Sequence, residues 1–219
     1  MTGDGITGDW ITNDGTGGVP DLKDLRKRVQ QRVDRLPQGL QDHINRVTAI
    51  ARELAPRHGL DPHLAALGMQ AHDVARAIPG PELLSLAASL NLPVDTVQLH
   101  APLMLHGPVG AELLRREDGL DDDSLYQAVY WHTTGHSSLD QLGKLVFLAD
   151  KLDPQKLPRY PYQPHLRELA LNDLDAALVE FFTQEMISLA GRGELIHPAM
   201  LEARNALLAA APETTESGY

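Results

Sequence analysis

Residues 61–78 read DPHLAALGMQAHDVARAI, and this stretch contains the pattern that decides the fold. Asp61 can cap a helix whose first turn contains Pro62, a position where proline needs no backbone N–H. Apolar and small residues then recur at helical spacing, and they share one face with His72. We predict that a helix starts at Pro62 and ends near Ile78, with His72 directed toward the core.

The rest of the chain repeats this pattern of amphipathic segments separated by proline and glycine. No alternating run of β-branched residues has the length of a strand, so we predict an all-α fold. Residues 91–102 are interrupted by proline, and we expect no regular helix there. The further helices are expected over residues 20–36, 40–58, from 81 onward, 106–118, 122–133, 138–152, 164–190 and 198–210.

Length and composition favour one domain. The chain has 219 residues, of which 42% are hydrophobic, and this length can enclose one core. We therefore expect a single domain over residues 20–211. Residues 1–19 are rich in Gly, Asp and Thr and are expected to form a disordered tail, while residues 212–219 are expected to be a frayed C-terminus.

Charge and residue usage exclude several classes of protein. The formal net charge is −11, which repels a phosphate backbone, so we expect no nucleic-acid partner. The absence of cysteine excludes disulfides and thiolate metal sites. We find neither an apolar segment of transmembrane length nor the pattern of a secretion signal at the N-terminus, so we expect no membrane partner and a cytoplasmic protein.

Six polar residues lie on the inward faces of the predicted helices. A single inward histidine is usually a core residue with a hydrogen-bonded partner. Two inward carboxylates are more demanding, because an unpaired buried carboxylate is disfavoured and we find no lysine or arginine on these faces. A divalent metal would satisfy the set, and its imidazole and carboxylate groups suit iron, manganese, zinc or cobalt rather than calcium. The six residues are His43, His72, Asp73, His106, His132 and Asp150.

Four motifs occur in a characteristic order after His43. They read AHDVAR (71–76), LHGPVGA (105–111), WHTTG (131–135) and LADKLDP (148–154). The order of a histidine, a His-Asp pair and a distant aspartate resembles that of HD-domain phosphohydrolases. The four motifs together resemble the YqeK family, whose members are symmetrical bis(5′-nucleosyl)-tetraphosphatases.

This resemblance covers about residues 38–190 and implies an HD-domain helical bundle with two divalent metal ions per chain, iron being the first candidate. The implied reaction is the hydrolysis of diadenosine tetraphosphate to two ADP by a metal-bridged hydroxide. Two ligand groups share Asp73 as a bridge: one metal is bound by His43, His72, Asp73 and Asp150, and the second by Asp73, His106 and His132.

Phosphate also needs cations outside the metal centre, and the candidates are Arg76, Lys156 and Lys144. For Arg76, one turn after the catalytic Asp73, we favour phosphate binding and assistance to catalysis over the alternative of a solvated helix residue. For Lys144 we expect a solvated helix residue instead. The other residues expected to bind substrate are His100, for which a surface histidine is the equal alternative, Thr133, Thr134, Gly135 and Lys156. The histidines outside every motif are expected to be structural or exposed, namely His58, His63, His165 and His197.

The chain departs from the family pattern at four positions. Leu40 and His136 stand where the family usually has arginine. Arg76 stands where the family has lysine, and Lys156 stands where it has arginine, so the positive charge is kept at these two positions. Phosphate chemistry is therefore expected, while the nucleotide contacts and a homodimer stay open. Two alternatives remain: another nucleotide phosphohydrolase, such as a nucleoside monophosphatase or a guanosine tetraphosphate hydrolase, or a nucleotide-binding regulatory domain without activity.

Overall fold

The computed structural model describes residues 22–211, and within this range the chain forms helices and no strand. The predicted all-α fold class is therefore confirmed. The tail expected at residues 1–19 and the frayed end expected at 212–219 lie outside the described residues.

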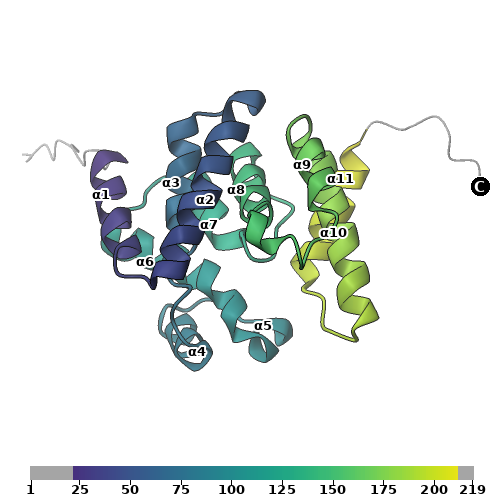
Figure 1. Cartoon of the computed structure of the whole chain (residues 1–219). Coiled ribbons are helices and arrows are strands. Elements are labelled where there is room, and N and C mark those ends of the chain that lie inside the picture. The colour runs from purple at the N-terminus through teal and green to yellow at the C-terminus, as the bar shows by residue number, and fades with distance from the viewer. Residues whose placement is uncertain (1–21, 212–219) are drawn as a thin grey trace, which may run out of the picture.

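Eleven α-helices and three short 3-10 helices make up this part of the chain (Figure 1). None of them is both long enough and apolar enough to cross a membrane. The α-helices are α1 (Leu22–Val33), α2 (Gln38–Leu54), α3 (Pro62–His72), α4 (Gly80–Ser89), α5 (Thr96–His100), α6 (His106–Asp118), α7 (Asp123–Trp131), α8 (Gln141–Lys151), α9 (Gln163–Ala170), α10 (Leu174–Gly191) and α11 (Pro198–Ala210). The 3-10 helices are η1 (Ala55–His58), η2 (Pro102–Leu105) and η3 (Pro154–Lys156).

Helix α8 lies at the centre of the bundle and packs against α2, α3, α7 and α10 (Figure 1). Its residues 145–149 are completely buried, because this segment is apolar on every side. Phe147 packs against Phe181 and Phe182 of α10, with ring centroids 5.3 and 5.2 Å apart. The C-terminal helices are thereby attached to the centre of the bundle.

Helices α4 and α5 form a lobe below the central helices in Figure 1. This lobe is attached to α6 through a small separate core, which includes Leu83, Ala87, Leu105 and Val109. The lobe and the C-terminal helices α9–α11 stand on two sides of the bundle centre (Figure 1).

Two predicted helix boundaries are wrong. The helix expected to end near Ile78 ends at His72. Beyond this residue the backbone hydrogen bonds span three residues instead of four, as in the bond from Val74 N–H to Ala71 O. The expected long helix over 164–190 is two helices, α9 and α10. The break occurs because the side chain of Asp173 caps α10 by accepting hydrogen bonds from two backbone N–H groups.

The stretch 91–102, where no regular helix was expected, contains the short helix α5. Asp95 and Gln98 form a reciprocal capping box at its start, which compensates for its short length. Helix α5 matters for function because it forms one wall of the cavity described below.

Candidate metal and substrate site

The six predicted polar residues converge where the ends of several helices meet. Every one of them is buried, with at most 8% of its surface exposed. Two of the positions follow directly from the early end of α3, since His72 is its last residue and Asp73 its C-cap. The contributing segments are α2 for His43, α3 for His72 and Asp73, α6 for His106, the residue after α7 for His132, and α8 for Asp150.

Three of the four imidazoles are oriented by backbone carbonyl groups three residues earlier. The Nδ1–oxygen distances are 2.6 Å for His72 and Met69, 2.5 Å for His106 and Leu103, and 2.7 Å for His132 and Val129. Because a carbonyl oxygen only accepts, each Nδ1 carries the proton and donates it. In the neutral imidazoles the three Nε2 atoms therefore present lone pairs to the centre of the site, as in metal-binding histidines.

The fourth imidazole is fixed by a carboxylate that the sequence analysis did not identify. His43 donates its Nδ1–H to Asp153 over 2.5 Å, and Arg46 binds both oxygens of Asp153 at 2.9 and 2.8 Å. Burial would raise the pKa of Asp153, but Arg46 and His43 lower it to about 2. The spacing of His43 and Arg46, three residues apart on one helix face, was the signal available in the sequence.

The two carboxylate oxygens of Asp73 face two different groups of donors. Oδ2 lies 3.7 Å from His43 Nε2 and 3.4 Å from His72 Nε2, which in turn lie 3.0 and 3.6 Å from Asp150 Oδ1. Oδ1 lies 3.0 Å from His106 Nε2 and 3.6 Å from His132 Nε2. A single carboxylate thus stands between the two halves of the site.

Two features of this centre are suited to a bound proton or metal. The buried Nε2 of His72 has no hydrogen-bond partner in the described part of the chain. The Nε2 atoms of His106 and His132 lie only 2.9 Å apart, so two lone pairs face each other unless a proton or a metal lies between them. The donor atoms also lie close enough for two metal sites, one from His43, His72 and Asp150 and one from His72, Asp73 and His132.

The charges of the centre fit a divalent metal. Burial would raise the pKa of both carboxyls, but His72 beside Asp73 and Lys151 beside Asp150 hold both pKa values well below their usual range. For His72 burial acts in the opposite direction and lowers the pKa, yet the two neighbouring carboxylates raise it to about 10. Burial lowers the pKa of His132 to about 3. A metal can replace the proton that the carboxylates attract to His72.

The expectation that no lysine or arginine neutralises the inward carboxylates is wrong for Asp150. Lys151 Nζ lies 2.7 Å from its Oδ2, and Lys156 Nζ lies 2.5 Å from its Oδ1. Lys151 is the last residue of α8 and Lys156 belongs to the turn η3 that follows. The helix ends at this point, so helical periodicity does not predict where either side chain points.

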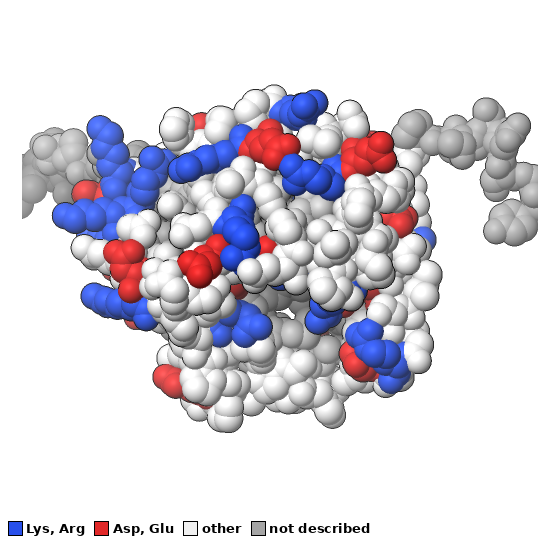
Figure 2. All heavy atoms as spheres, viewed as in Figure 1, with Lys and Arg blue, Asp and Glu red and all other residues white. Residues whose placement is uncertain are grey.

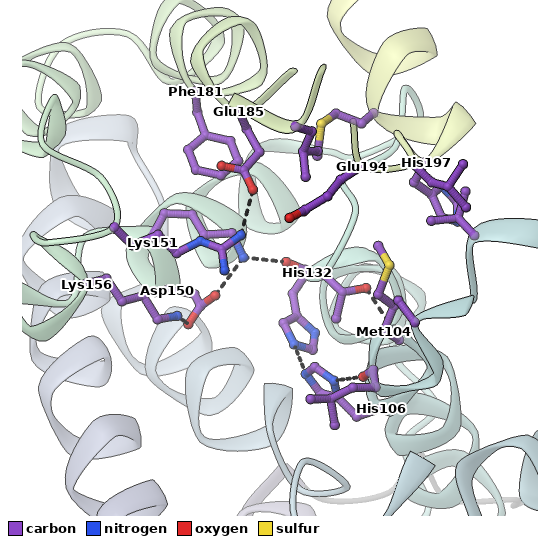
Figure 3. Close-up of a pocket in the computed structure, with 18 of the residues that line it drawn as sticks. Met104, His106, His132, Asp150, Lys151, Lys156, Phe181, Glu185, Glu194 and His197 are labelled. Atoms are coloured by element: carbon purple, nitrogen blue, oxygen red, sulfur yellow. Dashed lines mark hydrogen bonds and ion pairs between the residues drawn. The ribbon is translucent and has the colours of Figure 1, made fainter. Parts of the chain in front are cut away.

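A cavity of about 610 Å³ opens directly above this centre. Asp73, His106, His132 and Asp150 line it, whereas His43 and His72 are not among the lining residues. Figure 3 shows His106 and His132 on one side and Asp150 with Lys151 and Lys156 on the other. In Figure 2, a hollow with basic side chains near its edge separates the lower lobe from the helices above it.

The outer part of the cavity is more apolar and comes from two segments that are distant in the sequence. One is 97–104, in α5 and η2, and the other is 189–200, which runs from the end of α10 to the start of α11. His197, which was expected to be structural or exposed, is buried and lines the cavity, and its Nε2 lies 2.8 Å from Oδ2 of Asp95, the N-cap of α5.

Four of the residues expected to bind substrate line the cavity, and two do not. The four are Arg76, His100, Thr133 and Lys156. The side chain of Arg76 has no hydrogen bond or ion pair with any residue that the structure describes. Thr134 is buried and donates its hydroxyl to the carbonyl of Gly135.

The other polar residues singled out in the sequence lie outside the cavity lining. Lys144 is paired with Asp175 at 2.5 Å, so it is not a free solvated residue. His136 stacks on Trp131 with ring centroids 4.2 Å apart, and Leu40 packs against the apolar core.

Gly135 fixes the shape of the loop between α7 and α8. Its φ is +73°, and an added Cβ would lie 2.8 Å from Phe182 Cε1 and still closer to Cζ. We expect Gly135→Ala to lower the free energy of unfolding by about 2–4 kcal/mol, because overpacking and a left-handed backbone both oppose it. Denaturant unfolding measures this loss. Gly191→Ala is the control, since its Cβ would meet no atom within 4 Å, and an equal effect in both variants would refute this reading of the loop.

Comparison with known proteins identifies relatives of this chain. A family model described as HD domain matches residues 40–155. A Bacillus subtilis (strain 168) protein named symmetrical bis(5′-nucleosyl)-tetraphosphatase is 31% identical over 156 residues, which are 71% of this chain and 82% of the relative. A protein of the same name from Halalkalibacterium halodurans is 30% identical over 166 residues, which are 76% of this chain and 87% of the relative.

A solved structure shares the fold. It is described as a predicted HD superfamily hydrolase involved in NAD metabolism from Clostridium acetobutylicum. The two structures superpose with a TM-score of 0.78 and 25% sequence identity, and the match covers 84% of this chain and 97% of the other.

Proposed function

Because this chain belongs to the YqeK family of HD-domain phosphohydrolases, we propose that it is a metal-dependent hydrolase that cleaves diadenosine tetraphosphate symmetrically into two ADP. The observation that carries the proposal is the position of Asp73, whose two oxygens face two separate groups of imidazole donors. A cytoplasmic location, expected from the sequence, belongs to the same proposal.

The proposed metal ligands form two sets that share Asp73. His43, His72, Asp73 and Asp150 would bind one metal, and Asp73, His106 and His132 would bind the other. The unpartnered Nε2 of His72 and the facing Nε2 atoms of His106 and His132 support this assignment. Imidazole and carboxylate ligands accept several divalent ions, and iron is our first candidate, before manganese, cobalt and zinc. When bound, the metals would lower the pKa of water toward neutrality and stabilise the charge that develops on phosphoryl oxygens.

The residues around the cavity would bind and orient the polyphosphate. The cavity lining holds four cations and four carboxylates, and Lys151, Lys156 and Arg159 are each paired with one of these carboxylates. Two divalent metals at the centre would therefore give the cavity the positive charge that attracts a polyanion, and Arg76 would add a cation that has no carboxylate partner among the described residues. The volume of about 610 Å³ lies within the range of small-molecule sites, and its apolar outer walls suit a nucleoside.

The proposed roles of the substrate-binding residues follow from their positions. Arg76 would bind phosphate beside Asp73, and Lys156 would do so beside Asp150. His100 of α5 and Thr133 in the loop after α7 would contact the nucleotide elsewhere in the cavity lining. Thr134 and Gly135 do not line the cavity, so we propose that they support the loop that carries Thr133.

Arg76→Ala is expected to weaken substrate binding while both metals stay bound. The loss of one charge-assisted phosphate contact corresponds to about 1.5–3 kcal/mol in kcat/KM. Steady-state kinetics and elemental analysis together measure this. Arg76→Lys should lose less, and Arg57→Ala, at an exposed position of η1, is the matched control. An unchanged kcat/KM in Arg76→Ala would show that Arg76 is an ordinary solvated residue.

A panel of nucleotides tests the proposal against its alternatives. Protein purified without oxygen would be assayed with diadenosine tetraphosphate, nucleoside monophosphates and guanosine tetraphosphate, with metal content determined on the same sample. We expect the dinucleotide to have the highest kcat/KM. A preference for either of the others would indicate a different phosphohydrolase, and binding without turnover of any of them would indicate a regulatory domain.

A further inference from the structure

Lys151 is a buried cation whose position the proposed metal centre does not require. Only 7% of its surface is exposed, although lysine is rarely buried. Its Nζ lies 2.7 Å from Asp150 Oδ2, 3.1 Å from the carbonyl oxygen of His132 and 4.7 Å from the centre of the Phe147 ring. It is therefore attached to both halves of the site, through a carboxylate on one side and a backbone carbonyl on the other.

Neutralisation of Asp150 does not explain this buried ammonium. Lys156 already contacts Asp150 Oδ1 at 2.5 Å, and His43 Nε2 lies 3.0 Å from the same oxygen. Burial of a second ammonium beside one carboxylate is unfavourable unless another anion shares it. The sequence assigns no role to this lysine either. We therefore expect the second anion to come from a bound ligand.

The geometry leaves one donor of Lys151 available to that ligand. An ammonium group has three N–H donors, and those of Lys151 have two acceptors among the described residues, Asp150 and the His132 carbonyl. The side chain lines the cavity together with Asp73, His106 and His132, and Figure 3 shows it beside the two histidines. Lys151 therefore lines the cavity with one N–H that has no acceptor among the described residues, and a polyphosphate in the cavity would supply that acceptor.

We propose that Lys151 is a further catalytic residue that donates a hydrogen bond to the phosphoryl group undergoing hydrolysis, an inference that rests on the proposed function. In the reaction the oxygen of one water bonds to phosphorus and the water releases a proton to solvent, while one bridging P–O bond breaks and its electron pair leaves with the departing ADP. Negative charge grows on the phosphoryl oxygens and on the bridging oxygen. Lys151 transfers no proton; its fixed charge stabilises these oxygens. It is preorganised for this task because two acceptors already fix its position.

Lys156 differs from Lys151 in its exposure and in the oxygen of Asp150 that it contacts. Its side chain is 31% exposed, against 9% for Lys151, and it contacts the Asp150 oxygen that also faces His43 and His72. That oxygen is the one directed at the proposed metal site. Lys151 contacts the opposite oxygen, Oδ2, so its position is compatible with a metal bound at Oδ1.

The test compares Lys151→Met with Lys144→Met in the metal-loaded full-length protein. Lys144 lies on the same helix, does not line the cavity and is paired with Asp175, so its substitution controls for the loss of one lysine from α8. Four quantities are measured: metal content, melting temperature, the dissociation constant of inorganic phosphate, and kcat and KM for diadenosine tetraphosphate. Phosphate binding needs no turnover, so it reports on Lys151 even if the proposed substrate is wrong.

We expect Lys151→Met to keep both metals and its melting temperature, to bind phosphate about tenfold more weakly, and to lose about 100-fold or more in kcat. Lys151→Arg should recover part of kcat, and Lys144→Met should match the wild type. Unchanged phosphate binding in Lys151→Met would overturn the proposal. Loss of metal together with activity would also overturn it, because Lys151 would then only support the ligands.

A second variant covers the case in which the methionine variant does not fold. Lys151→Gln removes the charge but keeps N–H donors for the His132 carbonyl, and the same measurements apply to it. If neither variant folds, Lys151 is a structural residue and the proposal is wrong. If instead the wild type binds metals and phosphate but hydrolyses no dinucleotide, the proposed function fails while the phosphate comparison still decides the role of Lys151.

Discussion

Replacement of Asp73 by alanine is expected to reduce hydrolysis by at least about 1,000-fold, equivalent to about 4 kcal/mol, and to release metal from both halves of the site. Its Oδ2 faces His43 and His72, and its Oδ1 faces His106 and His132. No other carboxylate of the described chain stands between the two groups of imidazoles, so none can replace it. His72→Ala should have the same effect on activity, because it removes the buried Nε2 that lacks a partner.

Elemental analysis and kinetics on the same preparation measure the effect of Asp73→Ala. Asp123→Ala is the matched control, because that carboxylate is 90% exposed and makes one surface ion pair with Arg115. The control should keep full activity and metal content. Wild-type turnover with full metal content in Asp73→Ala would show that the assigned site is wrong.

The second large effect is expected when the pair His106 and His132 is disrupted. Their Nε2 atoms lie 2.9 Å apart and both approach Oδ1 of Asp73, which is compatible with the proposed second metal. We expect about two metals per chain in the wild type, about one in His106→Ala or His132→Ala, and a loss of about 100-fold or more in kcat in both variants. The first metal should remain, because its proposed ligands are untouched.

Metal analysis of protein prepared without oxygen tests this expectation. His165→Ala, at an exposed position of α9, controls for the loss of one imidazole. A fully active wild type with a single metal per chain, and with His106 and His132 packed only against protein, would reduce both to core histidines.

The fold class was predictable because apolar periodicity and the positions of proline and glycine mark most helices. The errors occurred where one polar side chain decides the outcome. The apolar pattern continues from α9 into α10, and only the capping bonds of Asp173 show that the helix is interrupted. Helix α5 depends in the same way on the reciprocal bonds of Asp95 and Gln98.

The convergence of the six polar residues was predictable because apolar periodicity directs all six toward the core, although Asp73 and His132 directly follow the ends of α3 and α7. The groups around them were not. Asp153 is buried, is bound by the partly exposed Arg46 and orients His43, but it lies 110 residues from that histidine in the chain. Lys151 and Lys156 approach Asp150 because α8 ends there, and periodicity predicts no direction beyond a helix end.

Only part of the cavity lining could be predicted from the sequence. Arg76, His100, Thr133 and Lys156 were expected at the substrate site and line the cavity, but no motif predicted the apolar residues of its outer walls at 97–104 and 189–200. Only the packing of the lobe and the C-terminal helices on the two sides of the bundle brings these segments together (Figure 1). The features that select a nucleotide therefore depend on tertiary structure, whereas the proposed metal ligands can be read from local patterns.

The central claim is that this chain cleaves diadenosine tetraphosphate at its central bridge. Chromatographic identification of the products formed by protein that contains two metals per chain tests it most directly. The account predicts two ADP for each dinucleotide consumed, no AMP or ATP, and loss of the reaction after metal removal. Equal amounts of AMP and ATP, or no hydrolysis by a protein with both metals bound, would contradict it.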